Sequence, residues 1–314
     1  MYRSLLFVMA ALLAAVVPAQ KIPGCRLSLQ APAIVPAKTT VELQLFVEVE
    51  EDVDVPSVVL NGLDLEVRID GEARPQIQVE GRGAPLRLNR GTRIVRTLRL
   101  PLDKLLDGVP ANEVRLCALS WRGLVGVDCS FKIAPSAEGI DVDQLDLAKT
   151  EVVLVTTHGE MRLQFRPDKA PNHVRNFVKL CLQGFYDGTK FHRVMKNFMI
   201  QGGCPNTLDD AKQDQWGLGG PGYSLDAEFN DLRHLRGTLS MARGPDPNSA
   251  GSGFFVVHAD SAHLDKLYTA FGNLVSGVDT LDRIANLPVG GKTTTTPKTP
   301  VVLRTAIVLP VMKK

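Results

Sequence analysis

The sequence predicts a mainly β protein with two domains. Three observations favour this fold class: short runs with apolar residues at every second position, turn residues between these runs, and few stretches of helical periodicity. A length of 314 residues is enough for two domains, each with its own core. The composition, 44% hydrophobic and 22% charged, is ordinary for a globular protein.

Residues 21–134 are predicted to form an antiparallel β-sandwich, for which an immunoglobulin-like arrangement is one option. The turn signals Asn61-Gly62 and Asp70-Gly71 separate the runs, and only Leu102–Leu106 has helical character. This half resembles no family that we can name. Its period-two runs are V-E-L-Q-L-F-V-E-V, L-D-L-E-V-R-I, T-R-I-V-R-T-L-R-L, E-V-R-L-C-A-L-S-W and V-D-C-S-F-K-I.

A linker over residues 135–148 is predicted to lead into a second domain, residues 149–314. The linker begins with the turn-forming stretch A-P-S-A-E-G. Pro171 fits the first turn of a helix ending near Leu182, and Gly184 fits its C-terminal cap. The other expected elements are strands over Glu151–Thr156, Glu160–Phe165 and Val301–Leu309 and a helix over Gly277–Leu287.

The sequence of residues 1–20 is typical of a cleavable signal peptide. Arg3 supplies a positive start, Leu5–Val17 is apolar, and small residues precede a cut after Ala19 or Gln20. The apolar stretch of thirteen residues is shorter than the roughly 20 that span a bilayer, so cleavage is favoured over a membrane anchor. We therefore expect an exported protein, periplasmic, in the cell envelope or secreted, without a stable membrane span.

Export permits disulfide bonds among the five cysteines, but the sequence does not select a pairing. Cys117 and Cys129 flank a predicted hairpin with a turn near Gly123, and either could instead pair with Cys25. Cys181 is expected to be buried on a helix face, and Cys204 follows two glycines in a loop. Redox catalysis and a zinc site are not predicted, because no C-x-x-C motif is present.

Arginines recur at short intervals between Arg82 and Arg99. They fit solvent-facing strand positions, no aromatic residues are interleaved for base stacking, and the acidic run Glu48–Asp54 is available to neutralise them. With a net charge of only +2, the sequence gives no support for nucleic-acid binding.

The motif with the most candidate functional residues is F-H-R-V-M-K-N-F-M-I-Q-G-G, from Phe191 to Gly203. Arg193 stands there among apolar residues, where a guanidinium needs an orienting partner, and the Gln201 amide is suited to that. Two more motifs follow, G-T-L-S-M-A-R-G-P-D-P-N-S-A-G-S-G-F-F-V-V and H-L-D-K-L-Y-T-A-F-G. Their order and spacing resemble those of the cyclophilin-type peptidyl-prolyl cis-trans isomerases, from about Thr150 to about Pro310.

The resemblance implies a closed eight-stranded β-barrel capped by two helices. It also implies an enzyme that isomerises X-Pro bonds in polypeptide clients, with no cofactor and no metal ion. Such catalysis needs a pocket for the proline ring and a donor to the imide nitrogen of the twisted amide.

By the same resemblance, Arg193 is the catalytic donor and Gln201 the residue that holds it. His192 is also placed at the site, although a structural role is favoured because no proton transfer is required. The remaining substrate-binding residues implied are Phe198, Met199, Phe255 and Leu264 around the proline ring, Tyr268 nearby, and the backbone of Ala242 and Arg243.

Three positions depart from the common family pattern. Gly253 replaces a glutamine and removes a polar contact near the arginine, His263 replaces a tryptophan and makes cyclosporin binding doubtful, and Tyr268 replaces a histidine. The loop Asn206–Gly217 is longer than usual and is expected to be a solvated excursion.

Two other classes of function stay open. One is a binding module that captures Pro-containing segments with little turnover, and the other is an adhesion or scaffold role carried by the N-terminal sandwich. The spacing of His258 and His263 matches no metal-ligand pattern, and the absence of a G-x-S-x-G motif argues against a hydrolase.

Overall fold

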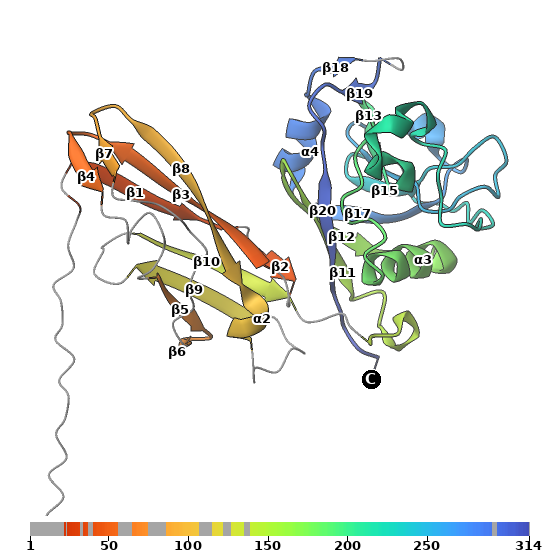
Figure 1. Ribbon diagram of the computed structural model, residues 1–314. Coiled ribbons are helices and arrows are strands. Elements are labelled where there is room, and N and C mark those ends of the chain that lie inside the picture. Colours follow the sequence, from red (N-terminus) through yellow and green to blue (C-terminus); the bar gives the residue numbers. More distant parts are fainter. Residues whose placement is uncertain are drawn as a thin grey trace, which may run out of the picture. The chain divides into compact units, whose positions relative to one another are not determined.

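The structure is a computed structural model, and it describes residues 22, 24–31, 34–36, 40–55, 65–74, 86–106, 115–121, 127–134, 139–290 and 294–313. The chain divides into two compact units, Met1–Ile133 and Ala134–Lys314, called unit 1 and unit 2 (Figure 1). The predicted signal peptide, residues 1–20, lies outside the described residues, as do residues 135–138 of the predicted linker and the turn near Gly123. Both units are mainly β in their described parts.

The described part of unit 1 contains two main sheets, a two-stranded ribbon and a short helix. The first sheet has the order β1 (Cys25–Gln30), β3 (Thr40–Val49) and β8 (Arg93–Pro101). The second has the order β2 (Ile34–Pro36), β10 (Asp128–Ala134), β9 (Arg115–Trp121), β5 (Leu65–Ile69) and β6 (Glu72–Ala73). The ribbon pairs β4 (Val53–Val55) with β7 (Leu86–Leu88), and the helix is α2 (Leu102–Leu105).

Side chains of both main sheets meet in one apolar core. Alternate residues of β3 from Val41 to Val49 are at most 2% exposed, and they join Leu119 and Trp121 of β9 and Phe131 of β10 in the same cluster. Each of the five predicted period-two runs contains a strand, which confirms the mainly β character of this half. The immunoglobulin-like sandwich stays a prediction.

All five cysteines lie in the described part of the chain, and all five are free thiols. Cys117 pairs with Phe131 across β9 and β10, whereas Cys129 pairs with Leu119, so the two cysteines are diagonal neighbours on one face. Diagonal neighbours lie about 7–8 Å apart, beyond the usual Cα separation of a disulfide. Burial, with a smaller contribution from Cys129, raises the pKa of Cys117 to about 12.

Unit 2 is built on one eight-stranded antiparallel sheet. The predicted strands Glu151–Thr156, Glu160–Phe165 and Val301–Leu309 are found as β11, β12 and β20, with small shifts at the ends. The hydrogen-bonded order is β13 (Arg193–Met195), β14 (Met199–Gly202), β16 (Phe254–Val257), β15 (Thr238–Met241), β17 (Ala270–Ser276), β12 (Gly159–Phe165), β11 (Glu151–Thr156) and β20 (Leu303–Leu309).

The predicted closed barrel is wrong in one respect, because β13 and β20 do not form a continuous ladder. The edge of the short β13 is occupied by another segment, since the Val194 N–H donates to the Thr295 carbonyl at 2.8 Å. Thr295 precedes β19 (Thr296–Pro297), which pairs with β18 (Val289–Gly290). In the described residues, an isolated bridge joins Lys190, which precedes β13, to Val302, which precedes β20.

Two α-helices pack on this sheet, as predicted. α3 (Pro171–Leu182) begins with proline and is followed by Gly184 at φ +66°, which identifies the predicted cap. Phe177 of α3 lies at the centre of an aromatic core cluster with Phe165, Tyr186, Phe254 and Phe271. The other helices are α4 (Val278–Ala285) and the 3-10 helices η1 (Val142–Gln144), η2 (Pro205–Leu208), η3 (Asp210–Gln215) and η4 (Ala262–Leu264).

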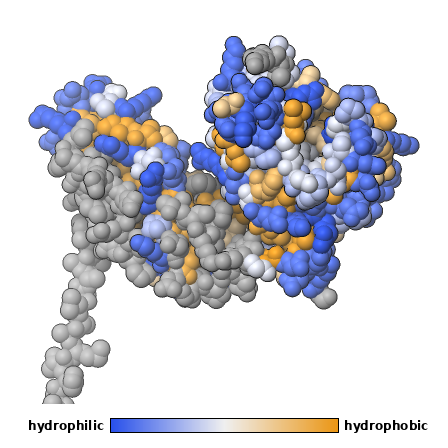
Figure 2. All heavy atoms as spheres, turned by 45° about the vertical axis from the view of Figure 1, so that its right-hand side comes forward, coloured by the Kyte–Doolittle hydropathy of each residue, from blue (hydrophilic) through white to orange (hydrophobic). Residues whose placement is uncertain are grey.

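Figure 2 shows hydrophilic residues over most of the visible described surface, interrupted by apolar patches. Within the described ranges, no helix has the length and apolar character needed to cross a membrane.

Candidate functional site

The β13–β14 hairpin places Arg193 directly opposite Gln201. The antiparallel register pairs these two residues, and the Arg193 Nη1 donates a hydrogen bond to Gln201 Oε1 at 3.1 Å. The other terminal nitrogen, Nη2, lies 3.2 Å from the Met195 sulfur. Among the described residues, no carboxylate forms an ion pair with Arg193. The guanidinium is therefore oriented by two neutral groups.

A cluster of apolar side chains adjoins this guanidinium. Met199, Phe255, Val257 and Leu264 form a buried cluster, against which the partly buried Phe198, Met195, Ala242 and Tyr268 pack. The Phe198 ring centre lies 5.9 Å from the Arg193 guanidinium carbon, and Phe255 pairs with Gln201 across β14 and β16. The residues predicted around the proline ring are thus brought together beside the predicted donor.

Tyr268, Ala242 and Arg243 lie on one side of this cluster. The Tyr268 ring meets the Phe255 ring edge-on at 5.9 Å, and the Arg243 guanidinium lies 4.6 Å from the Tyr268 ring centre. Arg243 is fixed there by hydrogen bonds to backbone carbonyls, including that of Leu267 at 3.0 Å. The Ala242 N–H donates to the Gly253 carbonyl at 2.9 Å, which ties the start of this segment to the chain just before β16.

His192 has a different environment from the other predicted site residues. Its side chain is buried, and a Cβ placed on Gly217 would lie 3.1 Å from its Nε2. Burial lowers the pKa of His192 from its ordinary 6.5 to about 4. A neutral imidazole packed under the loop fits the structural role that the sequence favoured over substrate binding.

The buried His192 should make unit 2 less stable in mild acid. The unfolded imidazole binds a proton near pH 6.5, whereas the folded one resists protonation until about pH 4. The contribution of His192 to the free energy of unfolding is therefore fully present above pH 6.5. It is lost as the pH falls from 6.5 towards 4, which lowers the free energy of unfolding by about 3 kcal/mol. Urea unfolding curves between pH 7.5 and 4.5 measure it, and His192→Asn should flatten the dependence by that amount. An equally steep dependence in the variant would contradict the assignment.

The sequence predicted that the loop over residues 206–217 is a solvated excursion, but the loop makes several contacts with the rest of unit 2. The Lys190 ammonium lies 5.1 Å from the Trp216 ring centre and 2.5 Å from the Asp210 carboxylate. The buried Cys204 sulfur accepts hydrogen bonds from the N–H groups of Gly217 and Gly219. Loop residues such as Asp214 still face solvent, as predicted.

Sequence reasoning missed a polar network that packs against Phe255 of the apolar cluster. His234 Nδ1 lies 3.0 Å from Asp265 Oδ1 and its Nε2 lies 2.9 Å from Ser240 Oγ, while the ring stacks on Phe255 at 6.1 Å. The order Asp–His–Ser is that of a hydrolase triad, but Ser240 is fully buried and its Oγ also lies 3.1 Å from the Thr269 carbonyl. The network thus supports Phe255 from behind, and no spacing in the sequence signals it.

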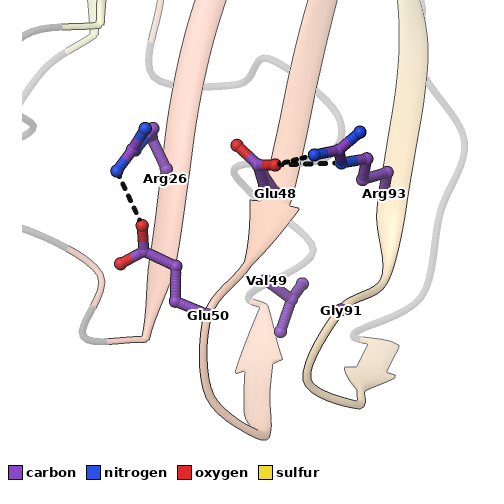
Figure 3. A pocket seen from close by; sticks show the side chains of 6 residues that line it. All are labelled: Arg26, Glu48, Val49, Glu50, Gly91 and Arg93. Atoms are coloured by element: carbon purple, nitrogen blue, oxygen red, sulfur yellow. Dashed lines mark hydrogen bonds and ion pairs between the residues drawn. The ribbon is translucent and has the colours of Figure 1, made fainter.

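A separate depression on unit 1 carries charges that are already paired (Figure 3). Arg26 lies 2.9 Å from the Glu50 carboxylate, and Arg93 lies 2.7 Å from that of Glu48. Arg93 of the basic stretch is thus neutralised by the acidic run, as the sequence suggested. Exposed pairs of this kind contribute little stability.

Comparison with known proteins agrees with this geometry. The family profile described as "Cyclophilin type peptidyl-prolyl cis-trans isomerase/CLD" matches residues 152–308. A peptidyl-prolyl cis-trans isomerase of Synechococcus elongatus is 50% identical over 123 residues, which cover 39% of this chain and 79% of that protein. Peptidyl-prolyl cis-trans isomerase B of Bacillus subtilis is 39% identical over 140 residues, which cover 44% and 92%.

Among solved structures, a cyclophilin type peptidyl-prolyl cis-trans isomerase of Cryptosporidium parvum is similar, with 30% identity and a TM-score of 0.45. The match covers 50% of this chain and 98% of that one. The family profile spans half of this chain, and the bacterial relatives match over most of their own length. The chain therefore belongs to the cyclophilin-type peptidyl-prolyl cis-trans isomerases, enzymes that act on proline-containing peptides.

Proposed function

We propose that this chain is an exported isomerase of folding clients in which Arg193 donates a hydrogen bond to the imide nitrogen of the X-Pro bond. One observation supports the proposal: the Arg193 guanidinium, held by Gln201, borders a cluster of apolar side chains that could form a pocket for a proline ring. Proline fits such a pocket because its ring is apolar and its nitrogen lies at the ring's edge. The arrangement would hold the bond that rotates next to the donor.

The chemistry needs no covalent step. Rotation about the X-Pro bond is slow because the amide loses its resonance in the twisted state, and the nitrogen then becomes pyramidal and basic. A donor aimed at this nitrogen stabilises the twisted state more than either planar isomer. Reaching an ordinary turnover requires lowering the barrier by roughly 4–7 kcal/mol. Arginine suits the task because it stays protonated and presents its donors in a fixed plane.

The other site residues would bind the substrate. Phe198, Met199, Phe255 and Leu264 would enclose the proline ring, while the backbone at Ala242 and Arg243 would align the peptide. Gly253 contributes no side chain. The His263 ring centre lies 5.4 Å from that of Phe198, at the position where many family members have a larger tryptophan. This smaller surface supports weak cyclosporin binding at most.

Exchange spectroscopy on a short Ala-Pro peptide tests the activity. The full chain should accelerate cis-trans exchange at substoichiometric concentration, with peptide resonances shifted by binding. Resonance shifts without faster exchange would instead support the second candidate, a module that captures Pro-containing segments. The absence of the glutamine at Gly253 is the observation that favours this second candidate.

Export rests on the sequence of residues 1–20. We infer that the protein reaches the periplasm, the cell envelope or the medium after cleavage behind Ala19 or Gln20. N-terminal sequencing of the full chain expressed in a bacterial host should find Gln20 or Lys21 first in the exported fraction. Leu12→Arg, which interrupts the apolar stretch, should keep the uncleaved chain inside the cell. Export of this variant at the normal level would contradict the proposal.

Unit 1 is proposed to be an immunoglobulin-like sandwich that holds clients, partners or another envelope component. Its continuous core from two sheets supports a stable presenting domain. Deleting residues 21–133 should reduce partner binding or localisation while turnover of a short peptide stays unchanged. If this variant kept normal localisation and partner binding, the proposed scaffold role of unit 1 would be wrong.

A further inference from the structure

The tip of the β13–β14 hairpin is docked on the chain that follows β16. The last hairpin pair is Met195 with Met199, so Lys196, Asn197 and Phe198 form the tip, with Asn197 at φ +59°. The Phe198 carbonyl accepts a hydrogen bond from the His258 N–H at 2.8 Å. The Asn197 N–H donates to the His258 ring nitrogen Nδ1 at 3.1 Å. His258 therefore binds the tip from both sides of the Asn197–Phe198 peptide bond.

These contacts fix the proton on the His258 ring. Because Nδ1 accepts from a backbone N–H, the proton of the neutral ring lies on Nε2. Nε2 is 3.2 Å from Asp282 Oδ1 of α4, the oxygen that also accepts from Arg236 Nη2 at 2.6 Å. Arg236 in turn donates to the His258 carbonyl and, through its N–H, to Asp260. The ring is 8% exposed, so water replaces none of these bonds easily.

The held tip carries a pocket residue. The Phe198 ring lies against the Arg193 guanidinium and 5.4 Å from the His263 ring. Without its acceptor the Asn197 N–H would be left unpaired at a strained left-handed position, which favours rearrangement of the tip. Arg193 would keep its contacts with Gln201 and Met195, so loosening the tip should affect the pocket wall more than the donor.

We propose that His258 is a positioning residue for the isomerase: its unprotonated Nδ1 holds the hairpin tip so that Phe198 closes the proline pocket. The inference rests on the proposed function of the pocket. It adds a residue that touches no substrate and links the pocket to α4 through Asp282.

Two substitutions separate the acceptor from the rest of the side chain. His258→Asn places Oδ1 near the position of Nδ1, whereas His258→Leu fills similar space without an acceptor, and both lose the contact with Asp282. In full-length protein we expect His258→Leu to raise KM roughly 5–30-fold with kcat within about twofold, and His258→Asn to stay within about threefold of wild type in both constants. His158→Leu, at a histidine in the β11–β12 turn, is the matched control and should change neither constant.

Equal KM values for the asparagine and leucine variants, whether raised or unchanged, would overturn the proposal. Because His258→Leu can fail to fold, the wild-type protein supplies an independent test by ¹⁵N NMR. The His258 ring should show an unprotonated Nδ1 with scalar coupling across the hydrogen bond to the Asn197 amide. A proton on Nδ1 would overturn the proposal even if the protein is an active isomerase. An inactive wild type with the expected tautomer would instead count against the proposed function alone.

Discussion

Replacing Arg193 with alanine is expected to lower kcat/KM for X-Pro isomerisation by about 100- to 1,000-fold. The loss should fall on kcat, because the guanidinium acts on the nitrogen of the twisted bond while the ground-state peptide is held by the apolar pocket. Arg193→Lys should recover little, since an ammonium keeps the charge but not the planar donors that Gln201 orients. Exchange spectroscopy gives the rates, and titration of peptide resonances gives the affinity for each variant.

Two comparisons make this result specific. Arg304→Ala removes an exposed arginine from β20 and should leave both constants unchanged. Gln201→Ala should lower kcat less than the loss of the arginine does, because the Met195 contact with Arg193 remains. A rate for Arg193→Ala within threefold of wild type would show that the pocket works without this donor, and the proposed role of Arg193 would be wrong.

Replacing Phe177 with alanine should lower the free energy of unfolding of unit 2 by about 3–5 kcal/mol. The ring is fully buried and has four aromatic neighbours with ring centres 5.2–5.7 Å away. Close packing leaves no side chain free to fill the cavity, so both the transfer of the ring and the cavity contribute. Because domains often have only 5–15 kcal/mol of stability, this change removes a large part of it. Urea unfolding measures the difference.

Phe229→Ala is the matched control, since it deletes the same side chain at a position that is 42% exposed. Its effect on unfolding should be below about 1 kcal/mol. If the two variants were equally stable, the aromatic cluster would not be the core of unit 2.

Local patterns in the sequence were sufficient for much of this fold. The alternation in β3 and the proline and glycine around α3 act within a few residues, so they mark strands and helix ends directly. The pairing of Arg193 with Gln201 is also local, because one hairpin with a short tip brings the two residues together.

Contacts between distant segments could not be predicted in this way. The Thr295 carbonyl reaches the edge of β13 from about a hundred residues away, and in the strand order β13 and β20 are not neighbours. His258 meets Asn197 and Asp282 only because three separate elements converge. No residue spacing encodes such convergence. The sequence therefore predicted the apolar residues beside Arg193 but not the role of His258 behind them.

The pairing of β11 with β20 determines how unit 2 would respond to mechanical force. Glu151 at the start of β11 pairs with Leu309 at the end of β20, and Leu145 bridges to Met312 just beyond. The first and last strands of the eight-stranded sheet are thus adjacent and antiparallel, with Glu151 and Leu309 at the same end. Tension applied through residues 145 and 312 would pull these strands apart from that end, loading their hydrogen bonds one after another rather than all together. Unit 2 should therefore unzip at low force, whatever its stability in solution.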